Sequence, residues 1–389
     1  MMSRDRVTWL AYLMLAFYGY FLNIFGPITP YLKSELKLSY TVSSLHFSAF
    51  ALGMIGAGLI GHSLIQRTGR WPALWIAAFG ISLGSLLLIA GHSPVLTIGA
   101  SFLMGLVGSL VLTIVPSVLA DQHGALRSMA FSEANVIASM LSAVAPVLVG
   151  WFASTVLGWR AALVSAVLAT LAMRFAFRGL KLPPIQAPTA PGQTRHSLPA
   201  LYWVYWAAIV AVVSVEFCMI FWSADYLETG LGMPKASAAQ AVSLFLAGMI
   251  IGRVAGSRLA ERFGVHTFVT ASLLIAAAGF LTYWMAASPL FGMVGLFITG
   301  LGVASLYPLI LSLTIGSAGG GTVQASAFSS LASGVAIFSL PLILGRLADA
   351  VGIHRAYVLV LLLLAMAFLL TQTTARFTRL RESLQSNLP

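Results

Sequence analysis

Apolar runs of about 20 residues or more recur along the whole chain, and this feature limits its possible folds more than any other. A run of that length is what an α-helix needs to cross the hydrocarbon core of a bilayer. Of the 389 residues, 59% are hydrophobic and 8% are charged, whereas a soluble domain carries about 25% charged residues. A membrane β-barrel would instead show short strands of alternating polarity. The sequence therefore predicts an all-α membrane protein.

The positions of the apolar runs predict twelve transmembrane helices. The expected spans are 7–31, 42–65, 71–91, 95–119, 126–152, 158–178, 201–227, 237–260, 266–286, 290–316, 323–348 and 354–375. The first run is longer than a signal-peptide core, so we expect it to be retained as a membrane helix. A long polar stretch after the sixth span, from Gly179 to Pro199, holds five prolines and predicts an extended linker. We expect six-helix bundles at 1–178 and 201–389, joined by a cytoplasmic linker at 179–200.

The distribution of basic residues predicts the orientation of the helices. The formal charge is +11, yet the basic residues stand in short loops between apolar runs, which argues against binding to nucleic acid. With both termini on one side, that side carries more than twice as many Lys and Arg residues as the other. The positive-inside rule then places both termini in the cytoplasm and the chain in the inner (cytoplasmic) membrane. The single cysteine, Cys218, excludes a disulfide framework, and no metal or cofactor is expected.

An internal repeat relates the two halves of the chain at a constant offset of 195 residues. The matched positions include Phe50 with Phe245, Gly53 with Gly248, Gly61 with Gly256, Arg67 with Arg262, Gly69 with Gly264, Pro146 with Pro341 and Gly150 with Gly345. Because six spans is an even number, the two copies have the same orientation in the membrane. A parallel repeat of this kind, with an axis along the membrane normal, is typical of transporters with two six-helix halves.

Two short motifs in loops and one in the tenth predicted helix resemble the major facilitator superfamily, and the resemblance covers essentially the whole chain. The segments are Gln66-Arg67-Thr68-Gly69-Arg70, Arg258-Leu259-Ala260-Glu261-Arg262-Phe263-Gly264 and Gly300-Leu301-Gly302…Tyr307-Pro308. The sequence departs from the family at Gln66, which replaces an acidic residue, and at Ser101, where many drug/proton antiporters have arginine. The resemblance implies alternating access, a cavity lined by the first, fourth, seventh and tenth helices, and an interface between the halves formed by the second, fifth, eighth and eleventh.

Small residues four apart form stripes on two of the predicted helices. The stripes are Gly53-x-x-x-Ala57-x-x-x-Gly61 and Gly248-x-x-x-Gly252-x-x-x-Gly256. Residues four apart share a helix face, and such a face lets another backbone approach closely. Two interpretations remain open: static packing of one helix on another, or the interface at which the two halves move.

Three charged residues lie well inside predicted spans, where a charge costs at least about 2.5–3.5 kcal/mol on insertion scales. Glu133 and Arg253 are each seven residues from the cytoplasmic end of their helices, so both lie roughly 10 Å deep. We therefore predict that Glu133 and Arg253 pair across the two halves and form an inter-half gate. Glu216 has no basic residue at its own depth, and isolation in an apolar environment disfavours a charged carboxylate. Glu216, with Glu133 as a second candidate, is therefore the predicted proton-coupling group.

The function predicted from these features is secondary active transport of a small organic solute, coupled to protons, by a protein that is not an enzyme. Candidate substrate-binding residues combine one amide with aromatic rings: Asn23, Tyr18, Phe217, Phe221, Trp222 and Tyr307. Aromatic rings in membrane helices also pack or face lipid, and that interpretation stays open. The alternatives are a broad-specificity efflux pump and a non-coupled facilitator. The expected partners are the solute, protons and the lipid bilayer, with the chain as a monomer.

Overall fold

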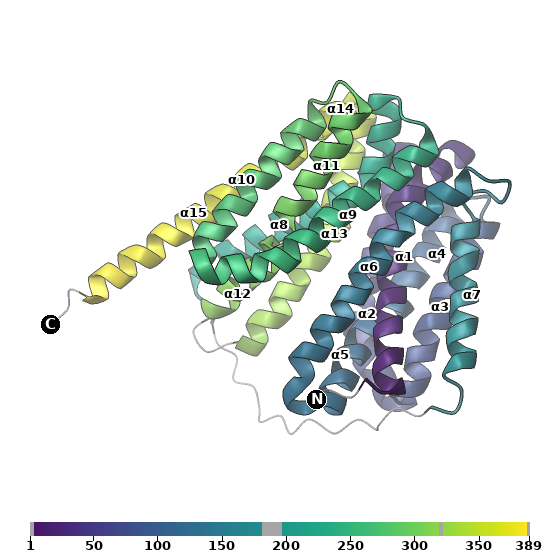
Figure 1. The fold of residues 1–389 in the computed structure, drawn as a ribbon, viewed down its shortest axis with the longest axis horizontal. Coiled ribbons are helices and arrows are strands. Elements are labelled where there is room, and N and C mark those ends of the chain that lie inside the picture. The colour runs from purple at the N-terminus through teal and green to yellow at the C-terminus, as the bar shows by residue number, and fades with distance from the viewer. Residues whose placement is uncertain (1–3, 181–196, 319–321, 387–389) are drawn as a thin grey trace.

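The computed structural model describes residues 4–180, 197–318 and 322–386, and all regular secondary structure in these ranges is helical (Figure 1). The predicted linker lies mostly outside the described residues. The helices are α1 (Arg6–Leu36), α2 (Tyr40–Thr68), α3 (Arg70–Ala90), α4 (Pro94–Gly108), α5 (Leu110–His123), the 3₁₀ turn η1 (Gly124–Leu126), α6 (Arg127–Ala153), α7 (Ala161–Ala176), α8 (Ala200–Leu231), α9 (Lys235–Phe263), α10 (Val265–Trp284), α11 (Pro289–Val303), α12 (Leu306–Gly316), α13 (Thr322–Val351), α14 (Ile353–Ala356) and α15 (Val358–Ser386).

Ten helical segments of the described residues are long and apolar enough to cross a membrane. One of them, Pro94–Ala153, is 60 residues long and contains the fourth and fifth predicted spans. The sixth predicted span corresponds to the shorter apolar helix Ala161–Ala176. The helical membrane class predicted from the sequence is confirmed, whereas the count of twelve crossings stays a prediction.

Helix boundaries follow local sequence signals. The hydroxyl of Ser39 accepts a hydrogen bond from the backbone N–H of Val42 and caps the start of α2. Gly69 and Gly264 have φ angles of +85° and +81°, a backbone conformation that glycine adopts at little cost. They connect α2 to α3 and α9 to α10. The bounds of α9 lie 195 residues after those of α2, and the bounds of α11 lie 195 residues after those of α4.

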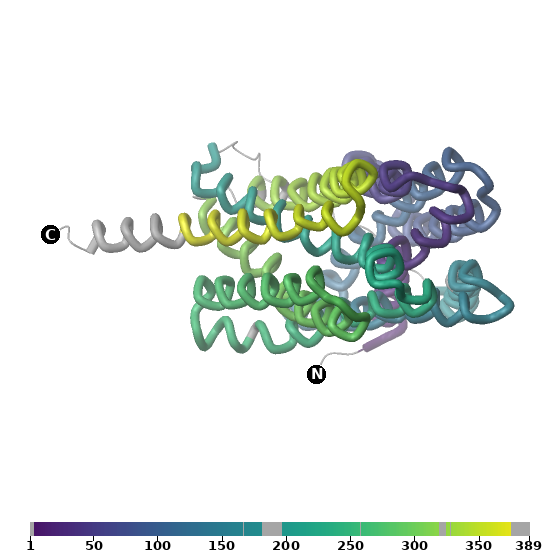
Figure 2. The backbone as a smooth tube through the Cα atoms, turned by 90° about the horizontal axis from the view of Figure 1, so that it is seen from above, coloured from purple at the N-terminus to yellow at the C-terminus, as the bar shows by residue number. Residues whose placement is uncertain are grey.

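The helices form two groups that lie side by side (Figure 1). Helices α1–α7 occupy the right of the view and α8–α15 the left, and Figure 2 shows the same division from above. The groups contact each other where α1 packs on α8, α2 on α13 and α6 on α9. In the predicted order, the last two contacts join the second helix to the eleventh and the fifth to the eighth, which are the helices that the resemblance implied at the interface.

The two ends of the molecule differ. We call the end with the N-terminus and the α5–α6 turn the terminal end, and the opposite end, with the α1–α2 and α8–α9 turns, the far end (Figure 1). Hydrogen bonds between the groups gather toward the far end. The hydroxyls of Ser44 and Ser48, in the first turns of α2, donate to the carbonyls of Pro341 and Phe338 on α13, at 3.3 Å and 2.7 Å. Both hydrogen bonds join α2 to α13 close to Pro341.

The two small-residue stripes pack inside the groups, which decides between the two interpretations. A Cβ added at Gly53 would overlap the backbone of α4, and one added at Gly248 would overlap the backbone of α11. Gly252 likewise lies against the end of α11, and Gly256 against Ser305 just before α12. The interpretation as a moving interface is therefore wrong for these faces. Their role in this structure is close packing within each group.

Candidate functional site

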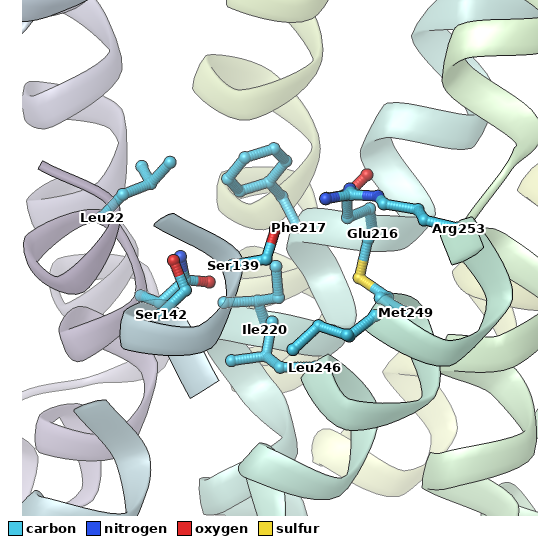
Figure 3. Close-up of a pocket in the computed structure, with 11 residues that line it drawn as sticks. Leu22, Ser139, Ser142, Glu216, Phe217, Ile220, Leu246, Met249 and Arg253 are labelled. Carbon is cyan, nitrogen blue, oxygen red and sulfur yellow. The ribbon is translucent and has the colours of Figure 1, made fainter. Parts of the chain in front are cut away.

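A pocket of about 380 Å³, a volume that includes open solvent at its mouth, lies between the two groups of helices (Figure 3). It is lined by α1 and α6 from one group and by α8 and α9 from the other. The lining residues are Leu22, Asn23, Ser139, Ser142, Glu216, Phe217, Ile220, Leu246, Met249, Ile250 and Arg253. The resemblance implied walls from the first, fourth, seventh and tenth helices. This pocket has residues of the first and seventh, together with the fifth and eighth.

Glu216 and Arg253 form the charged side of the pocket (Figure 3). Oε1 of Glu216 lies 3.6 Å from Nη2 of Arg253, and Nε of Arg253 donates to the carbonyl of Ala304 at 3.3 Å. The side chain of Glu216 is 16% exposed and that of Arg253 is 44% exposed. The expectation that Glu216 has no basic partner is therefore wrong. Counting residues from the helix ends did not predict this contact, because α8 and α9 are antiparallel neighbours and the long arginine side chain reaches along them.

The predicted ion pair between Glu133 and Arg253 does not form in this structure. The carboxylate of Glu133 instead accepts hydrogen bonds from Arg4 at 2.8 Å and 2.9 Å and from the hydroxyl of Tyr12 at 3.1 Å. All three residues belong to the first group, near the terminal end. Equal predicted depth does not establish a contact, because it leaves the direction of each side chain around its helix axis undefined.

Asn23 provides a polar group on the opposite side of the pocket. Its Nδ2 donates to the carbonyl of Gly19 at 2.9 Å, whereas its Oδ1 is buried without a hydrogen-bond partner. Ser139 and Ser142 of α6 line the pocket beside it. Sequence reasoning missed the two serines, although their spacing of three places them on one helix face. A buried amide oxygen without a partner costs about 1–3 kcal/mol, so this acceptor is available to a ligand.

Of the aromatic candidates, Phe217 lines the pocket and the others pack elsewhere. The ring of Phe221 stacks on Phe47 of the other group, with centroids 4.1 Å apart. Nε1 of Trp222 donates to the carbonyl of Pro341 at 3.1 Å. The hydroxyls of Tyr18 and Ser109 are 3.2 Å apart. Tyr307 is half-buried against the apolar core. The assignment of these four aromatic residues to the substrate site is not supported by their positions.

An ion pair and a helix cap join the two groups at the far end, and the sequence predicted neither. The ammonium of Lys33 on α1 pairs with the carboxylate of Asp225 on α8, which is fully buried. The same ammonium lies 3.8 Å from the ring centroid of Tyr40. The carboxylate of Asp349 on α13 accepts hydrogen bonds from the backbone N–H groups of Tyr40 and Thr41, both at 2.8 Å. The sequence feature that could have predicted these contacts is the presence of charged residues at the ends of neighbouring spans.

The two copies of the loop motif have different surroundings. In the first copy, Arg67 is exposed, Gly69 forms the turn, and the buried guanidinium of Arg70 pairs with Asp121 at the end of α5. In the second copy, Glu261, Arg262 and Gly264 are exposed. The side chain of Arg262 lies over the ring of Phe263, 5.4 Å from its centroid. The first copy therefore connects α3 to α5 within one group of helices.

Membrane-length helices in two groups, with a polar pocket between them, define a helical membrane protein of the transporter class. A family model described as Major Facilitator Superfamily matches residues 11–339. The chain therefore belongs to the Major Facilitator Superfamily, whose members are transporters and not enzymes.

Individual relatives agree with this assignment. A protein of Brucella abortus named "Glucose/galactose transporter" is 26% identical over 89% of each chain. A bacterial homolog of the human lysosomal transporter Spinster, solved in an inward-facing and occupied conformation, superposes with a TM-score of 0.80 at 14% identity over 97% of this chain and 98% of that one. A D-xylose-proton symporter superposes with a TM-score of 0.71 at 15% identity over 95% and 96%. At these identities the two structures show the fold alone.

Proposed function

We propose that this protein is a proton-coupled secondary transporter that moves a small organic solute across the inner membrane by alternating access. The observation that carries the proposal is the position of the pocket. Residues of both helix groups line it, it holds Glu216 and Arg253, and the contacts between the groups gather on its far side. Opposed groups of helices around a central site are the arrangement that alternating access requires.

Two equivalent six-helix halves are part of this proposal, with twelve crossings in all. Support comes from the helix bounds, which repeat at 195 residues in α2 and α9 and in α4 and α11. It also comes from matched close contacts: an added Cβ would meet Phe50 O at Gly105 and Phe245 O at Gly300. The same packing at the same offset is what a parallel duplication produces.

The terminal end is proposed to be cytoplasmic. In support, that end carries more of the Lys and Arg residues of the sequence, in line with the positive-inside rule. With this orientation the far end is periplasmic, and the ion pair and cap there close the outer side of the pocket. The structure is then inward-facing, the conformation named for the similar bacterial Spinster homolog.

Glu216 is the proposed proton-binding group. It lies in the pocket, its side chain is 16% exposed, and Arg253 stands beyond direct hydrogen-bond length at 3.6 Å. Protonation of Glu216 would release Arg253, so proton binding and solute binding would change the same pocket. The efflux-pump alternative was supported by the aromatic content of the chain, and four of the aromatic candidates pack outside the pocket.

The test is uptake into proteoliposomes with an imposed pH gradient. Because one relative is named a glucose/galactose transporter, the first probes are radiolabelled D-glucose and D-galactose, followed by a panel of sugar alcohols and sugar acids. We expect the parent protein to accumulate at least one probe when the gradient is present. Glu216→Gln should still exchange that probe across the membrane but should not accumulate it.

Glu133, the second candidate for proton coupling in the sequence, lies outside the pocket and is bonded to Arg4 and Tyr12. We therefore propose no coupling role for it, and Glu133→Gln is the matched control for the same chemical change. It should accumulate solute as the parent does. Accumulation by Glu216→Gln with the parent's pH dependence would contradict the assignment of Glu216. Movement of every probe only down its own gradient, in the parent, would support a non-coupled facilitator instead.

A further inference from the structure

The two sides of the pocket offer different chemistry to a ligand (Figure 3). Asn23 belongs to α1, and Ser139 and Ser142 belong to α6, so the lining residues of the α1–α6 side include neutral polar groups. Glu216 and Arg253 lie on the α8–α9 side. Between them the pocket is apolar, with Phe217, Ile220, Leu246 and Met249. A ligand that matches this pocket has polar groups at both ends.

The unpaired acceptor of Asn23 favours a ligand that donates a hydrogen bond. The residue is 7% exposed, and its Nδ2 is already bonded to the carbonyl of Gly19. The remaining group, Oδ1, is an acceptor with no partner among the described residues. A hydroxyl or N–H group of a ligand would satisfy it and remove the cost of leaving it unpaired.

The positive charge of Arg253 favours a ligand with an anionic group. Its Nε donates to the carbonyl of Ala304, and Nη2 reaches Glu216 only at 3.6 Å, whereas a charge-assisted N–H···O bond is about 2.7–2.9 Å long. The guanidinium therefore keeps donor capacity on the pocket side, and its side chain is 44% exposed. The planar fork of arginine matches the two oxygens of a carboxylate.

We propose that the pocket binds a small hydroxylated carboxylate, such as a sugar acid or another hydroxy acid. The carboxylate would bind the guanidinium of Arg253, and a hydroxyl would donate to Oδ1 of Asn23, while the carbon chain crosses the apolar floor beside Phe217. The ligand carboxylate would compete with Glu216 for Arg253. This inference rests on the proposed function, because it names the substrate class of the same site.

Isothermal titration of the purified protein with three probes of similar length tests the inference. D-Gluconate has a carboxylate and hydroxyls, sorbitol has the hydroxyls alone, and hexanoate has the carboxylate alone. We expect gluconate to bind at least about tenfold more tightly than either of the others, because sorbitol lacks the carboxylate for Arg253 and hexanoate lacks the hydroxyl for Asn23.

Substitutions at two positions, Arg253 and Asn23, test the two ends of the site separately. Arg253→Gln should weaken gluconate binding at least about tenfold and leave sorbitol binding unchanged. Arg253→Lys, which keeps the charge, should weaken gluconate binding less than Arg253→Gln. Asn23→Leu should weaken gluconate about three- to tenfold and leave hexanoate unchanged. Thermal unfolding of each variant checks that it is folded.

Equal binding of sorbitol and gluconate by the parent, or an Arg253→Gln variant that binds gluconate normally, would overturn the inference in favour of a neutral solute. Absence of binding of all three probes to the folded parent would also overturn it. Failure of the proposed function has a separate signature. The parent would then bind gluconate in titration but show no gluconate counterflow in proteoliposomes.

Discussion

Lys33 and Asp225 form an ion pair that connects the two helix groups. Because the pair is buried, removing either charge is expected to be costly. Asp225 is fully buried and Lys33 is 18% exposed. Removing one partner of a buried pair costs about 3–5 kcal/mol, because the other charge is left without compensation. Replacing both with apolar side chains of similar size is often neutral. Closure of the far end should therefore be weakened when one of the two charges is removed, and much less when both are replaced by apolar side chains.

Lys33→Met and Asp225→Leu, singly and together, test this dependence. Spin labels at Val156→Cys and Met285→Cys, which are exposed on far-end loops, report the distance between the groups in a Cys218→Ala background. We expect each single change to shift the population toward longer distances. The double change should return it toward the parent, because no unpaired charge remains. A double variant as open as the singles would contradict this account.

At the scale of elements, the start of α2 is capped from the other group of helices. Two backbone N–H groups at the positive end of the α2 dipole donate to Asp349 on α13, and a negative charge there is favourable. The cap exists only while the far end is closed. The α2–α13 contact therefore includes an electrostatic term that is lost when the groups separate.

Asp349→Asn should weaken far-end closure by about 1–2 kcal/mol, a change of about five- to thirtyfold in the ratio of closed to open molecules. The same pair of spin labels measures it, as a larger fraction of long distances. Asp5→Asn is the matched control. Asp5 caps α1 by accepting from the N–H of Thr8 within the same group, so its loss should leave the far-end distance unchanged. An effect of equal size in both variants would indicate general destabilisation.

At the scale of the whole molecule, the two ends should respond in opposite directions. Two groups that move as units around a central site cannot open at the far end without closing at the terminal end. Labels at Ala125→Cys and Gly316→Cys, exposed residues of the terminal end in different groups, measure the second distance. In Lys33→Met we expect this distance to shorten as the far-end distance lengthens. Lengthening at the far end with no change at the terminal end would favour a channel.

The sequence by itself determined the helical membrane class of the fold and identified four of the eleven residues that line the pocket. The length of the apolar runs, the repeat at an offset of 195 residues and the presence of charged residues inside these runs can all be read from the linear sequence. The cost of a buried charge identified Glu216 and Arg253, and the family resemblance identified Asn23 and Phe217 as candidates. All four line the pocket.

Only the tertiary structure decided which of these groups meet. Depth in the membrane can be counted along a helix, but contact also needs the rotation of each helix about its axis and the choice of neighbour. For that reason Glu133 was paired with Arg253 and proved to contact Arg4 instead. For the same reason Phe221 and Trp222 pack between helices rather than in the pocket. The packing of one helix face on another fixes that rotation, and no spacing within a single helix contains it.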